Sequence, residues 1–386
     1  MPTAYIVEAV RTAGGRRKGS LAEVHPVDLG AAMINALLDR SGIDPSAIED
    51  VIMGCVTQGG EQSFAFGRNI VLASKLPESV PAVTIDRQCG SSQQSVQFAA
   101  QAVMSGTQDL VIAGGTESMT RVPMFTNRLL HDQAGLGVGP FPPSVLDRYG
   151  IKDFSQFAGA QMIADKYGYS REQLDAFALQ SHLKAAAASD AGAFVDEIVP
   201  VMTPEGWFQT DEGIRRDTTM EKLASLKTLE EGGSITAGNA SQISDGSSGV
   251  LIASEKAVKD HGLKPIARLH HFSVSAGDPV VMLEEPIPAT RKALAKAGMS
   301  LSDIGLYEVN EAFSPVPMAW LQAFDADPAR LNVNGGAIAL GHPLGASGTR
   351  LMTTMIHALR KRGERYGLQT MCEGGGIANV TIVEAL

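Results

Sequence analysis

The chain has 386 residues, of which 44% are hydrophobic, and its formal net charge is -10. This length predicts two or three packed modules, and the acidic balance disfavours nonspecific binding to nucleic acid or anionic membranes. No apolar run approaches the roughly 20 residues that a membrane-spanning helix needs, and three scattered cysteines fit a reducing compartment better than a disulfide framework. With no basic, apolar leader at the N-terminus, we expect a soluble, cytoplasmic protein without membrane insertion.

The first part of the chain alternates predicted strands and helices. Residues 4–10 are typical of a strand, and residues 36–41 form the end of a helix that stops at Gly42, because glycine readily adopts the left-handed turn there. A short helical turn and a strand over residues 51–54 follow. A long helix is expected from Ser91 to Ser105, and an apolar strand over residues 110–115.

Residues from about 120 to 234 do not continue this alternation. The segment is rich in proline, and we expect one helix in it, over residues 170–188, with a loop at residues 135–140. Long irregular insertions of this kind are often lids or binding regions.

The last part of the chain repeats the order of the first. A helix ends at Gly298, a strand covers residues 306–310, a long helix spans about Ser347 to Arg362, and an apolar strand runs from residue 368 into glycines. Two similar helix–strand modules indicate a duplicated α/β architecture with helices covering the sheets. The alternative is chance similarity between the two stretches.

Two cysteines lie at glycine-containing turns. Cys89 precedes the helix that begins at Ser91, where the unpaired N–H groups and the helix dipole favour a thiolate. Considered alone, Cys89 would be a buried, inert thiol. Cys372 precedes three glycines whose N–H groups could form an oxyanion hole. A phosphate cradle is the competing interpretation, but no Gly-Lys-Ser or Gly-Lys-Thr follows.

His342 and Asn310 add polar groups to this set. His342 stands between Gly341 and Pro343 in a segment too glycine-rich for a helix or strand, and it could take the Cys89 proton. We expect Ser347 to cap the helix that follows. Asn310 comes directly after a predicted strand, where α/β folds place site residues, although alone it would be an ordinary strand-end cap.

Together these segments resemble the thiolase family over nearly the whole chain. The matching blocks are residues 6–12, 114–119, 236–241, 310–313, 341–343 and 372–376. The resemblance implies an α/β thiolase fold, with duplicated α/β halves layered α-β-α-β-α and a long inserted loop domain. It assigns residues 1–119 plus 237–265 to the N-terminal half, 120–236 to the inserted CoA-binding loop domain, and 266–386 to the C-terminal half.

The family resemblance also implies a reaction, the thiolytic cleavage of a 3-ketoacyl-CoA by CoA to acetyl-CoA and a shortened acyl-CoA. By the same resemblance Cys89 is the nucleophile, His342 activates it, and Asn310 holds a water beside the enolate oxygen. Cys372 is the acid/base, for which an ordinary thiol pKa of about 8.5 is suitable in both directions. The N–H groups of Cys89 and Gly374 form the second oxyanion hole.

CoA recognition is assigned by the resemblance to the insertion and to two later segments. Arg215 and Lys222 match the stretch that binds CoA, and Ser241 matches the serine near the pantetheine arm. Ala312 and Phe313 complete the expected contacts. Arg215 and its neighbour Arg216 have an alternative role as solvated surface charges. We expect no metal and no cofactor beyond CoA as substrate.

Departures from the family pattern bear on the substrate. Short-chain acetoacetyl-CoA thiolases carry a His-Met-Gly where this chain has residues 157–162, without a histidine. Smaller residues there leave room for medium, long or cyclic acyl groups, and the region resembles thiolases that act on steroid side chains, so we expect a degradative enzyme of β-oxidation. In addition, Ile377 and Ala378 replace a glycine-containing end of the last motif.

Three alternatives remain at this point. The first is an acetoacetyl-CoA thiolase (acetyl-CoA C-acetyltransferase) in short-chain synthesis or breakdown. The second is a thiolase-like condensing enzyme, against which the second cysteine argues, and the third is a non-catalytic lipid-binding protein of the same fold. The resemblance further implies a homodimer or homotetramer, with docking to a β-oxidation partner subunit as a further expectation.

Overall fold

In the computed structural model, which describes residues 2–386, one long twisted sheet crosses the molecule. Its strand order is β11-β12-β13-β10-β1-β9-β5-β3-β4, with the short strands β2 and β6 attached to β9 and β1. The first half contributes β1 (Ala4–Thr12), β2 (Gly15–Arg16), β3 (Asp50–Gly54), β4 (Ala82–Ile85), β5 (Leu110–Ser118) and β9 (Ser244–Ser254). The second half contributes β10 (Ala267–Ala276), β11 (Leu306–Val309), β12 (Tyr366–Glu373) and β13 (Ile377–Ala385).

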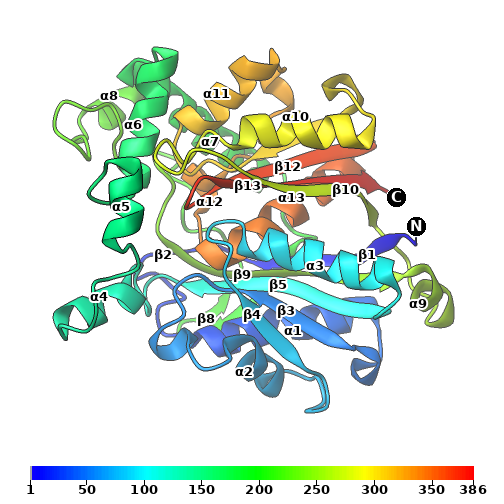
Figure 1. Cartoon of the computed structure of the whole chain (residues 1–386). Helices are drawn as coiled ribbons and strands as arrows, with labels where there is room; N and C mark the ends of the chain where they lie inside the picture. The colour runs from blue at the N-terminus through cyan, green and yellow to red at the C-terminus, as the bar shows by residue number, and fades with distance from the viewer. Residues whose placement is uncertain (1) are drawn as a thin grey trace.

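The helices cover and separate the two halves of this sheet. The first half holds α1 (Pro26–Ser41), α2 (Phe66–Ala73), α3 (Ser91–Ser105) and α9 (Glu255–Asp260). The second holds α10 (Pro286–Ala297), α11 (Pro315–Phe324), α12 (Ala337–Leu340) and α13 (Ser347–Arg362). Figure 1 shows five layers: α10 and α11, the strands β10 to β13, the helices α3 and α13, the strands of the first half, and α1 with α2. The predicted duplicated, layered α/β fold is confirmed.

The middle layer consists of α3 and α13, which pack against each other and against strands of both halves. Thirteen of the sixteen residues of α13 are buried, so this helix is internal rather than amphipathic. Strands β5 and β9 are likewise buried along their whole lengths, as expected for strands covered on both faces. The two half-sheets meet through β1 and β10, which pair over only Tyr5↔Arg268 and Ile6↔Ala267.

The insertion between β5 and β9 is more regular than the sequence analysis predicted. It contains α4 (Thr126–Gln133), α5 (Pro143–Tyr149), α6 (Gln156–Tyr167), α7 (Arg171–Asp190), β6 (Ile198–Val199), β7 (Val201–Thr203), β8 (Gly206–Phe208) and α8 (Met220–Ala224). Helix α7 matches the predicted helix over residues 170–188, but the expectation of only one helix was wrong, because α6 begins at a serine cap, Ser155, that local reading can miss.

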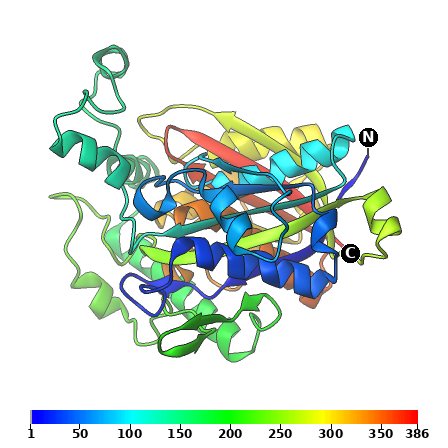
Figure 2. The ribbon, with the colours of Figure 1, turned by 90° about the horizontal axis from the view of Figure 1, so that it is seen from below.

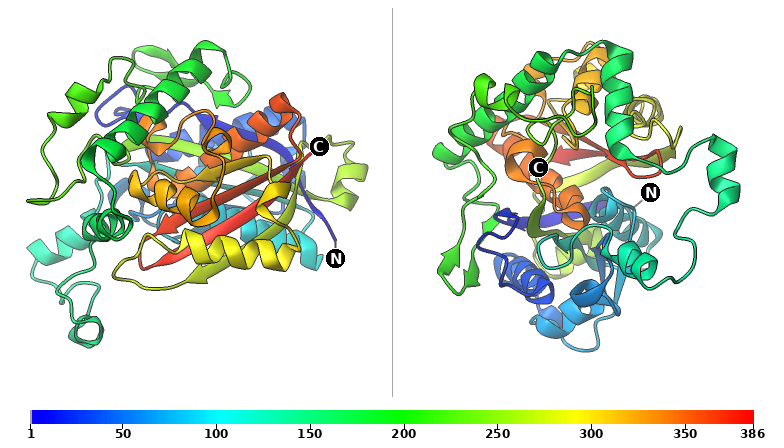
Figure 3. Two further views of the ribbon diagram at one scale, coloured as in Figure 1. Left: turned by 90° about the horizontal axis from the view of Figure 1, so that it is seen from above. Right: turned by 90° about the vertical axis from the view of Figure 1, so that its left-hand side faces the viewer.

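The insertion gathers at the end of the layered body opposite the two chain termini (Figure 3). Helices α4 and α5 stand out from this body as an arm (Figure 2). The arm exposes Phe125, Leu129 and Leu130, and the loop after α4 exposes Leu136 and Val138.

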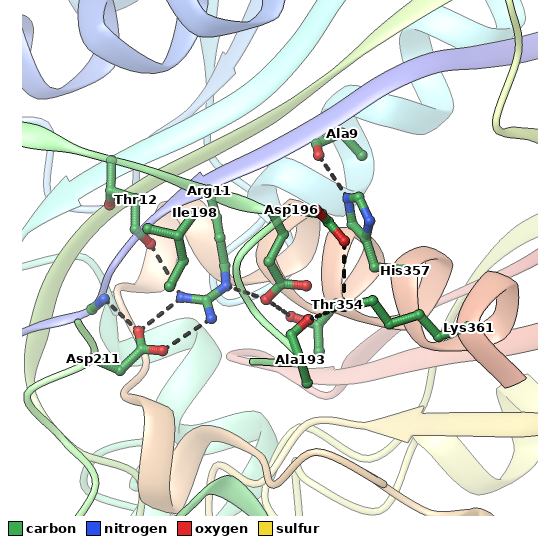
Figure 4. A network of polar contacts seen from close by, with 12 residues as sticks. Ala9, Arg11, Thr12, Ala193, Asp196, Ile198, Asp211, Thr354, His357 and Lys361 are labelled. Carbon is green, nitrogen blue, oxygen red and sulfur yellow. Dashed lines mark hydrogen bonds and ion pairs between the residues drawn. The ribbon is translucent and has the colours of Figure 1, made fainter. Parts of the chain in front are cut away.

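Arg11 of β1 fastens the insertion to the sheet (Figure 4). Its Nε donates to Glu197 at 2.6 Å, and its two terminal nitrogens donate to the carboxylate of Asp211 at 2.7 and 3.0 Å. All three side chains are buried. Burial alone would lower the pKa of Arg11, but the two carboxylates raise it overall, so the cation is retained inside the protein.

Candidate active site

Cys89 lies in a tight turn at the start of α3. Gly90 is the N-cap of the helix, and Gln88 adopts a φ of 48°, in the left-handed region. A Cβ at Gly90 would fall 2.0 Å from Oε1 of Glu373, so any larger residue there would have to displace the Glu373 side chain. The turn of the first half therefore lies directly against the end of β12 in the second half, where Cys372 is located.

Cys372 and Gly374 face this turn from the hairpin between β12 and β13. The side chain of Cys372 is fully buried, and it lies within electrostatic reach of Cys89. The backbone N–H groups of Cys89 and Gly374 both point to Sγ of Cys89 and stabilise its anionic form. The two thiols and the two N–H groups that the sequence analysis selected are thus brought together.

The protonation state of the two thiols differs from the expectation. Burial raises the pKa of the Cys89 thiol to about 12, and the carboxylate of Glu373 contributes to the increase. Burial also raises the pKa of the Cys372 thiol well above its ordinary value, with Cys89 and Glu373 as further causes. The predictions of a resting Cys89 thiolate and an ordinary Cys372 pKa were therefore wrong, since desolvation outweighs the helix N-terminus.

The orientation of the His342 ring is fixed by Ser347, the residue that the sequence analysis expected to cap the next helix. Its Nδ1 lies 2.5 Å from Oγ of Ser347, and that hydroxyl donates its own proton to the carbonyl of Pro343 at 2.9 Å. Because the hydroxyl proton is used, Ser347 accepts from Nδ1–H and leaves Nε2 as the free base. Burial, followed by the charge of Arg350, lowers the pKa of His342 to about 3, so the ring is neutral.

Two local expectations about this segment are corrected. Helix α13 begins at Ser347 without a side-chain cap, because the serine hydroxyl is engaged with His342 and Pro343. The segment judged too glycine-rich for a helix contains α12, whose four residues are all buried. The four residues between Gly336 and Gly341 are Ala-Ile-Ala-Leu, which have a good intrinsic helix propensity despite the flanking glycines.

Asn310 lies beside His342 at the end of β11. Its Nδ2 is 3.4 Å from Nε2 of His342, and its backbone N–H donates to the carbonyl of Thr370 at 3.1 Å. Oδ1 of Asn310 is buried and meets no protein partner among residues 2–386. A buried acceptor of this kind is suited to hold a water or a substrate hydrogen-bond donor.

Glu117 connects the His342 segment to the first half. Its carboxylate accepts from the N–H groups of Val56 and Thr57 at 2.8–3.0 Å and of Gly345 at 2.8 Å, with Val56 bound by Oε2. Burial raises the pKa of Glu117, although these N–H donors oppose the change. The segment that carries His342 is thus held against the first half of the chain, from which it is distant in the sequence.

The predicted CoA-contact residues fall in two neighbouring places. Arg215 and Lys222 line one pocket of the insertion, together with His182, Thr218 and Gln242. His182 was missed by the sequence analysis. The signal for it is weak, because a single buried histidine in a helix is usually structural; here its Nδ1 accepts from the N–H of Arg215 at 3.2 Å.

Ser241, Ala312 and Phe313 do not line that pocket but lie together nearby in the chain fold. The N–H of Ser241 donates to the carbonyl of Ala312 at 2.9 Å, and Ala240 forms a β-bridge with Phe313. The ring of Phe313 meets that of Phe157 edge to face at 5.7 Å, so the segment without histidine borders this place. Arg216 instead forms a solvated ion pair with Asp190 at the surface.

Comparisons with known proteins agree over the whole length. The family models described as thiolase N-terminal domain and thiolase C-terminal domain match residues 4–256 and 263–385. The steroid 3-ketoacyl-CoA thiolase FadA6 of Mycobacterium tuberculosis is 55% identical, with 100% of this chain and 95% of that protein covered. The 3-ketoacyl-CoA thiolase of Bacillus subtilis is 40% identical over 100% of both chains.

Among solved structures, the acetyl-CoA acetyltransferase of Bacillus anthracis superposes with a TM-score of 0.91. It is 37% identical, and the match covers 100% of this chain and 99% of that one. The part of the chain that the structure describes contains no helix of the length and apolar character needed to cross a membrane.

Proposed function

The chain belongs to the thiolase family, and we propose that it cleaves 3-ketoacyl-CoA with CoA to acetyl-CoA and a shortened acyl-CoA. The observation that carries the proposal is the meeting of two buried thiols at the end of β12, beside the strand β11, whose end holds the unpaired oxygen of Asn310 next to the neutral His342. A Claisen cleavage needs these parts: a nucleophile with its base, a proton donor to carbon, and donors for two oxyanions.

In the first half-reaction Cys89 attacks the 3-keto carbon while Nε2 of His342 takes the thiol proton. The N–H groups of Cys89 and Gly374 stabilise the tetrahedral oxyanion. The bond between the second and third carbons then breaks, and the electron pair passes to the enolate of acetyl-CoA. The Cys372 thiol protonates the carbon of this enolate, so acetyl-CoA leaves and the acyl group stays on Cys89 as a thioester.

In the second half-reaction CoA releases the acyl group. The Cys372 thiolate takes the proton of the CoA thiol, the sulfur of CoA attacks the acyl carbon, and Cys89 leaves as a thiolate. His342 returns its proton to Cys89. Cys89, His342 and Cys372 all regain their starting protonation while the CoA thiol proton replaces the one given to acetyl-CoA, which agrees with a buried site whose groups are neutral at rest.

The low pKa of His342 has a place in this cycle. A histidine with a pKa of about 3 returns its proton readily, and a Cys89 thiol with a pKa near 12 takes it back readily. The ion pair that forms when the Cys89 proton moves to His342 is therefore short-lived unless the sulfur attacks the substrate and the N–H donors stabilise the resulting oxyanion. Such stabilisation exists only when the substrate oxygens carry charge. It therefore increases the rate of the reaction without tightening the binding of the substrate.

The acyl group that we propose is bulky, from β-oxidation of fatty acids or steroid side chains. Support comes from the 55% identity to the steroid enzyme, against 37–42% for the acetyl-CoA acetyltransferases that also match. In addition, Phe157 and Ala160 stand where a polar histidine is expected in short-chain enzymes, and Ala160 is buried. Cleavage of acetoacetyl-CoA is the alternative.

For CoA we propose the insertion pocket with Arg215 and Lys222 for the phosphates, and Ser241, Ala312 and Phe313 for the pantetheine arm. Both cations lie at the rim of one pocket, although Lys222 is now paired with Asp217. No cofactor other than the CoA substrate is part of this proposal.

We also propose a homo-oligomer, formed through β4. This strand is the edge of the sheet, and it exposes Val83, while Phe64, Leu72 and Phe98 expose large apolar side chains in the same half. The apolar arm of α4 would serve a second interface in a tetramer or in docking to a partner subunit. Three free cysteines support a cytoplasmic location.

A specificity series tests the proposed function. The purified enzyme is given CoA and 3-ketoacyl-CoA substrates of four carbons, of longer straight chains and of a steroid side chain, and loss of the 3-ketoacyl-CoA absorbance is followed. The steroid or longer substrates should give the highest kcat/KM. Highest turnover of acetoacetyl-CoA would favour the short-chain alternative, and no turnover of any substrate would exclude a thiolase.

A further inference from the structure

Glu373 is a buried carboxyl group that the proposed reaction does not use. It ends β12 between the acid/base Cys372 and the oxyanion residue Gly374, and its side chain is 0% exposed. Oε1 accepts the N–H of Asn379 at 3.0 Å. Oε2 is buried and has no hydrogen-bond partner in the described part of the chain.

The side chain of Glu373 points at the turn that carries the nucleophile. Oε1 lies 2.0 Å from the position that a Cβ of Gly90 would occupy, so the carboxyl group fills the space that a side chain at residue 90 would need. On the far side of the same contact, Gln88 packs against Gly374, where an added Cβ would lie 2.9 Å from its Oε1. The carboxyl group of Glu373 is therefore packed between the turn that carries Cys89 and the hairpin that carries Gly374.

Few charges surround this carboxyl group. The turn supplies Asp86, Arg87 and Cys89, and its own strand supplies Cys372. Helix α3 has no charged residue over its whole length, and the neighbouring residue of β13 is the neutral Asn379. Burial raises the pKa of Glu373 well above its ordinary value, and Arg87 and the Asn379 N–H only partly oppose this.

We propose that Glu373 is a positioning residue that acts through Cys89: its neutral form holds the nucleophile turn, and its ionised form makes the Cys89 proton harder to remove. The inference rests on the proposed function only in taking Cys89 as the nucleophile. It adds a fourth proton-binding group to the site, after Cys89, His342 and Cys372, and the ionisation of this group changes the reactivity of Cys89 with pH.

The expected size of the effect follows from Coulomb's law. A unit charge roughly 7 Å from a thiolate, at an effective dielectric constant of about 20, changes the thiol ionisation constant roughly fiftyfold. Glu373→Gln keeps the shape and removes the charge. Cys89 in that variant should therefore react with iodoacetamide at least about tenfold faster than in the wild type at a pH where Glu373 is ionised.

The measurement is the rate of Cys89 alkylation from pH 6 to pH 10, read from the mass of the Cys89 peptide so that Cys372 and Cys55 are not counted. The alkylation rate of the wild type should depend on two ionisations, those of Glu373 and Cys89. The rate of Glu373→Gln should depend on that of Cys89 alone, which should occur at lower pH than in the wild type. Glu78→Gln removes an exposed carboxylate of the same charge and should match the wild type. Alkylation of Cys89 requires no catalytic turnover. The result therefore tests the role of Glu373 even if the protein shows no thiolase activity.

The outcomes separate cleanly. Superimposable profiles for the wild type and Glu373→Gln would overturn the proposal, and so would a slower reaction in the variant. If Glu373→Gln does not fold, the wild-type profile decides alone, since a single ionisation there excludes a second coupled group. A structural role without charge control predicts that Glu373→Gln changes thermal stability but leaves the profile unchanged.

Discussion

Oγ of Ser347 accepts a hydrogen bond from Nδ1–H of His342 at 2.5 Å, although the sequence analysis gave the two residues different roles. Removing this acceptor in Ser347→Ala frees the ring to turn or to place its proton on Nε2, where it cannot act as a base. We expect kcat to fall about tenfold, the value of one hydrogen bond, with a smaller change in KM. Ser347→Thr keeps the hydroxyl and should restore most of the activity; equal loss in both variants would contradict the orientation role.

The two cysteines should fail in different ways. Cys89→Ala removes the acyl carrier, so no acyl-enzyme forms. Cys372→Ser keeps the carrier but replaces a thiol by a much weaker acid, so the enzyme should still take an acyl group from acyl-CoA yet lose carbon–carbon cleavage. Intact-mass spectrometry measures the acyl adduct, and the 3-ketoacyl-CoA assay measures cleavage. Normal cleavage by Cys372→Ser would show that another group donates the proton.

The buried neutral ring of His342 makes stability depend on pH. Its pKa is about 3 when folded and about 6.5 when unfolded, so the unfolded chain binds the extra proton at intermediate pH. This part of the stability is complete above about pH 6.5 and is lost as the pH falls toward 3. Relative to His342→Gln, the wild type should lose roughly 1.4 kcal/mol per pH unit between pH 6 and pH 4. Urea denaturation at several pH values tests this, and parallel curves would argue against it.

Arg11→Met should be one of the costliest substitutions outside the site. It leaves Glu197 and Asp211 buried without their cation, which costs about 3–5 kcal/mol. The exposed Arg16→Met changes the same charge in the same region and should stay within about 0.5 kcal/mol. The free energy of unfolding in urea compares them. A small loss in Arg11→Met would mean that the insertion is held by other contacts.

Gly115 sets the distance between β5 and the His342 segment. A Cβ at this position would lie 1.9 Å from the carbonyl oxygen of Gly345, a backbone atom that cannot turn away. Gly115→Ala should therefore cost about 1–3 kcal/mol or more and lower kcat by shifting His342. In Gly59→Ala the new methyl group meets its nearest neighbour at 3.8 Å, so this control should be nearly neutral in both measurements.

Local sequence signals were sufficient for the elements that position the site. The predicted bounds of α3 and α13, Ser91–Ser105 and Ser347–Arg362, agree with the structure, because Gly106 and Gly363 end both helices in left-handed conformations. The proximity of Cys89 and Cys372 also agrees, although it rested on family resemblance, and the approach of His342 to the two thiols stays a prediction. No local pattern indicates which turn of one half meets which turn of the other.

The properties that the sequence could not predict are those that depend on burial by segments distant in the chain. The high pKa of Cys89 arises from the packing of Glu373 and the second half over a turn that, alone, would be solvated. The arm helix α4 begins at Phe125 in a left-handed conformation without a side-chain cap, so no start signal is present. The bounds of the three predicted domains stay a prediction.

The layered arrangement of two similar halves leaves each copy chemically incomplete. In the proposed reaction the first copy supplies the nucleophile and the second supplies the base and the carbon acid, and β1 and β10 join their sheets at two residue pairs. Catalytic turnover is therefore a direct report of whether the halves are docked. A chain cut between α9 and β10 would be silent as separate fragments and would regain activity only by complementation. The two copies therefore have different roles in the proposed reaction, and neither would be an active enzyme without the other.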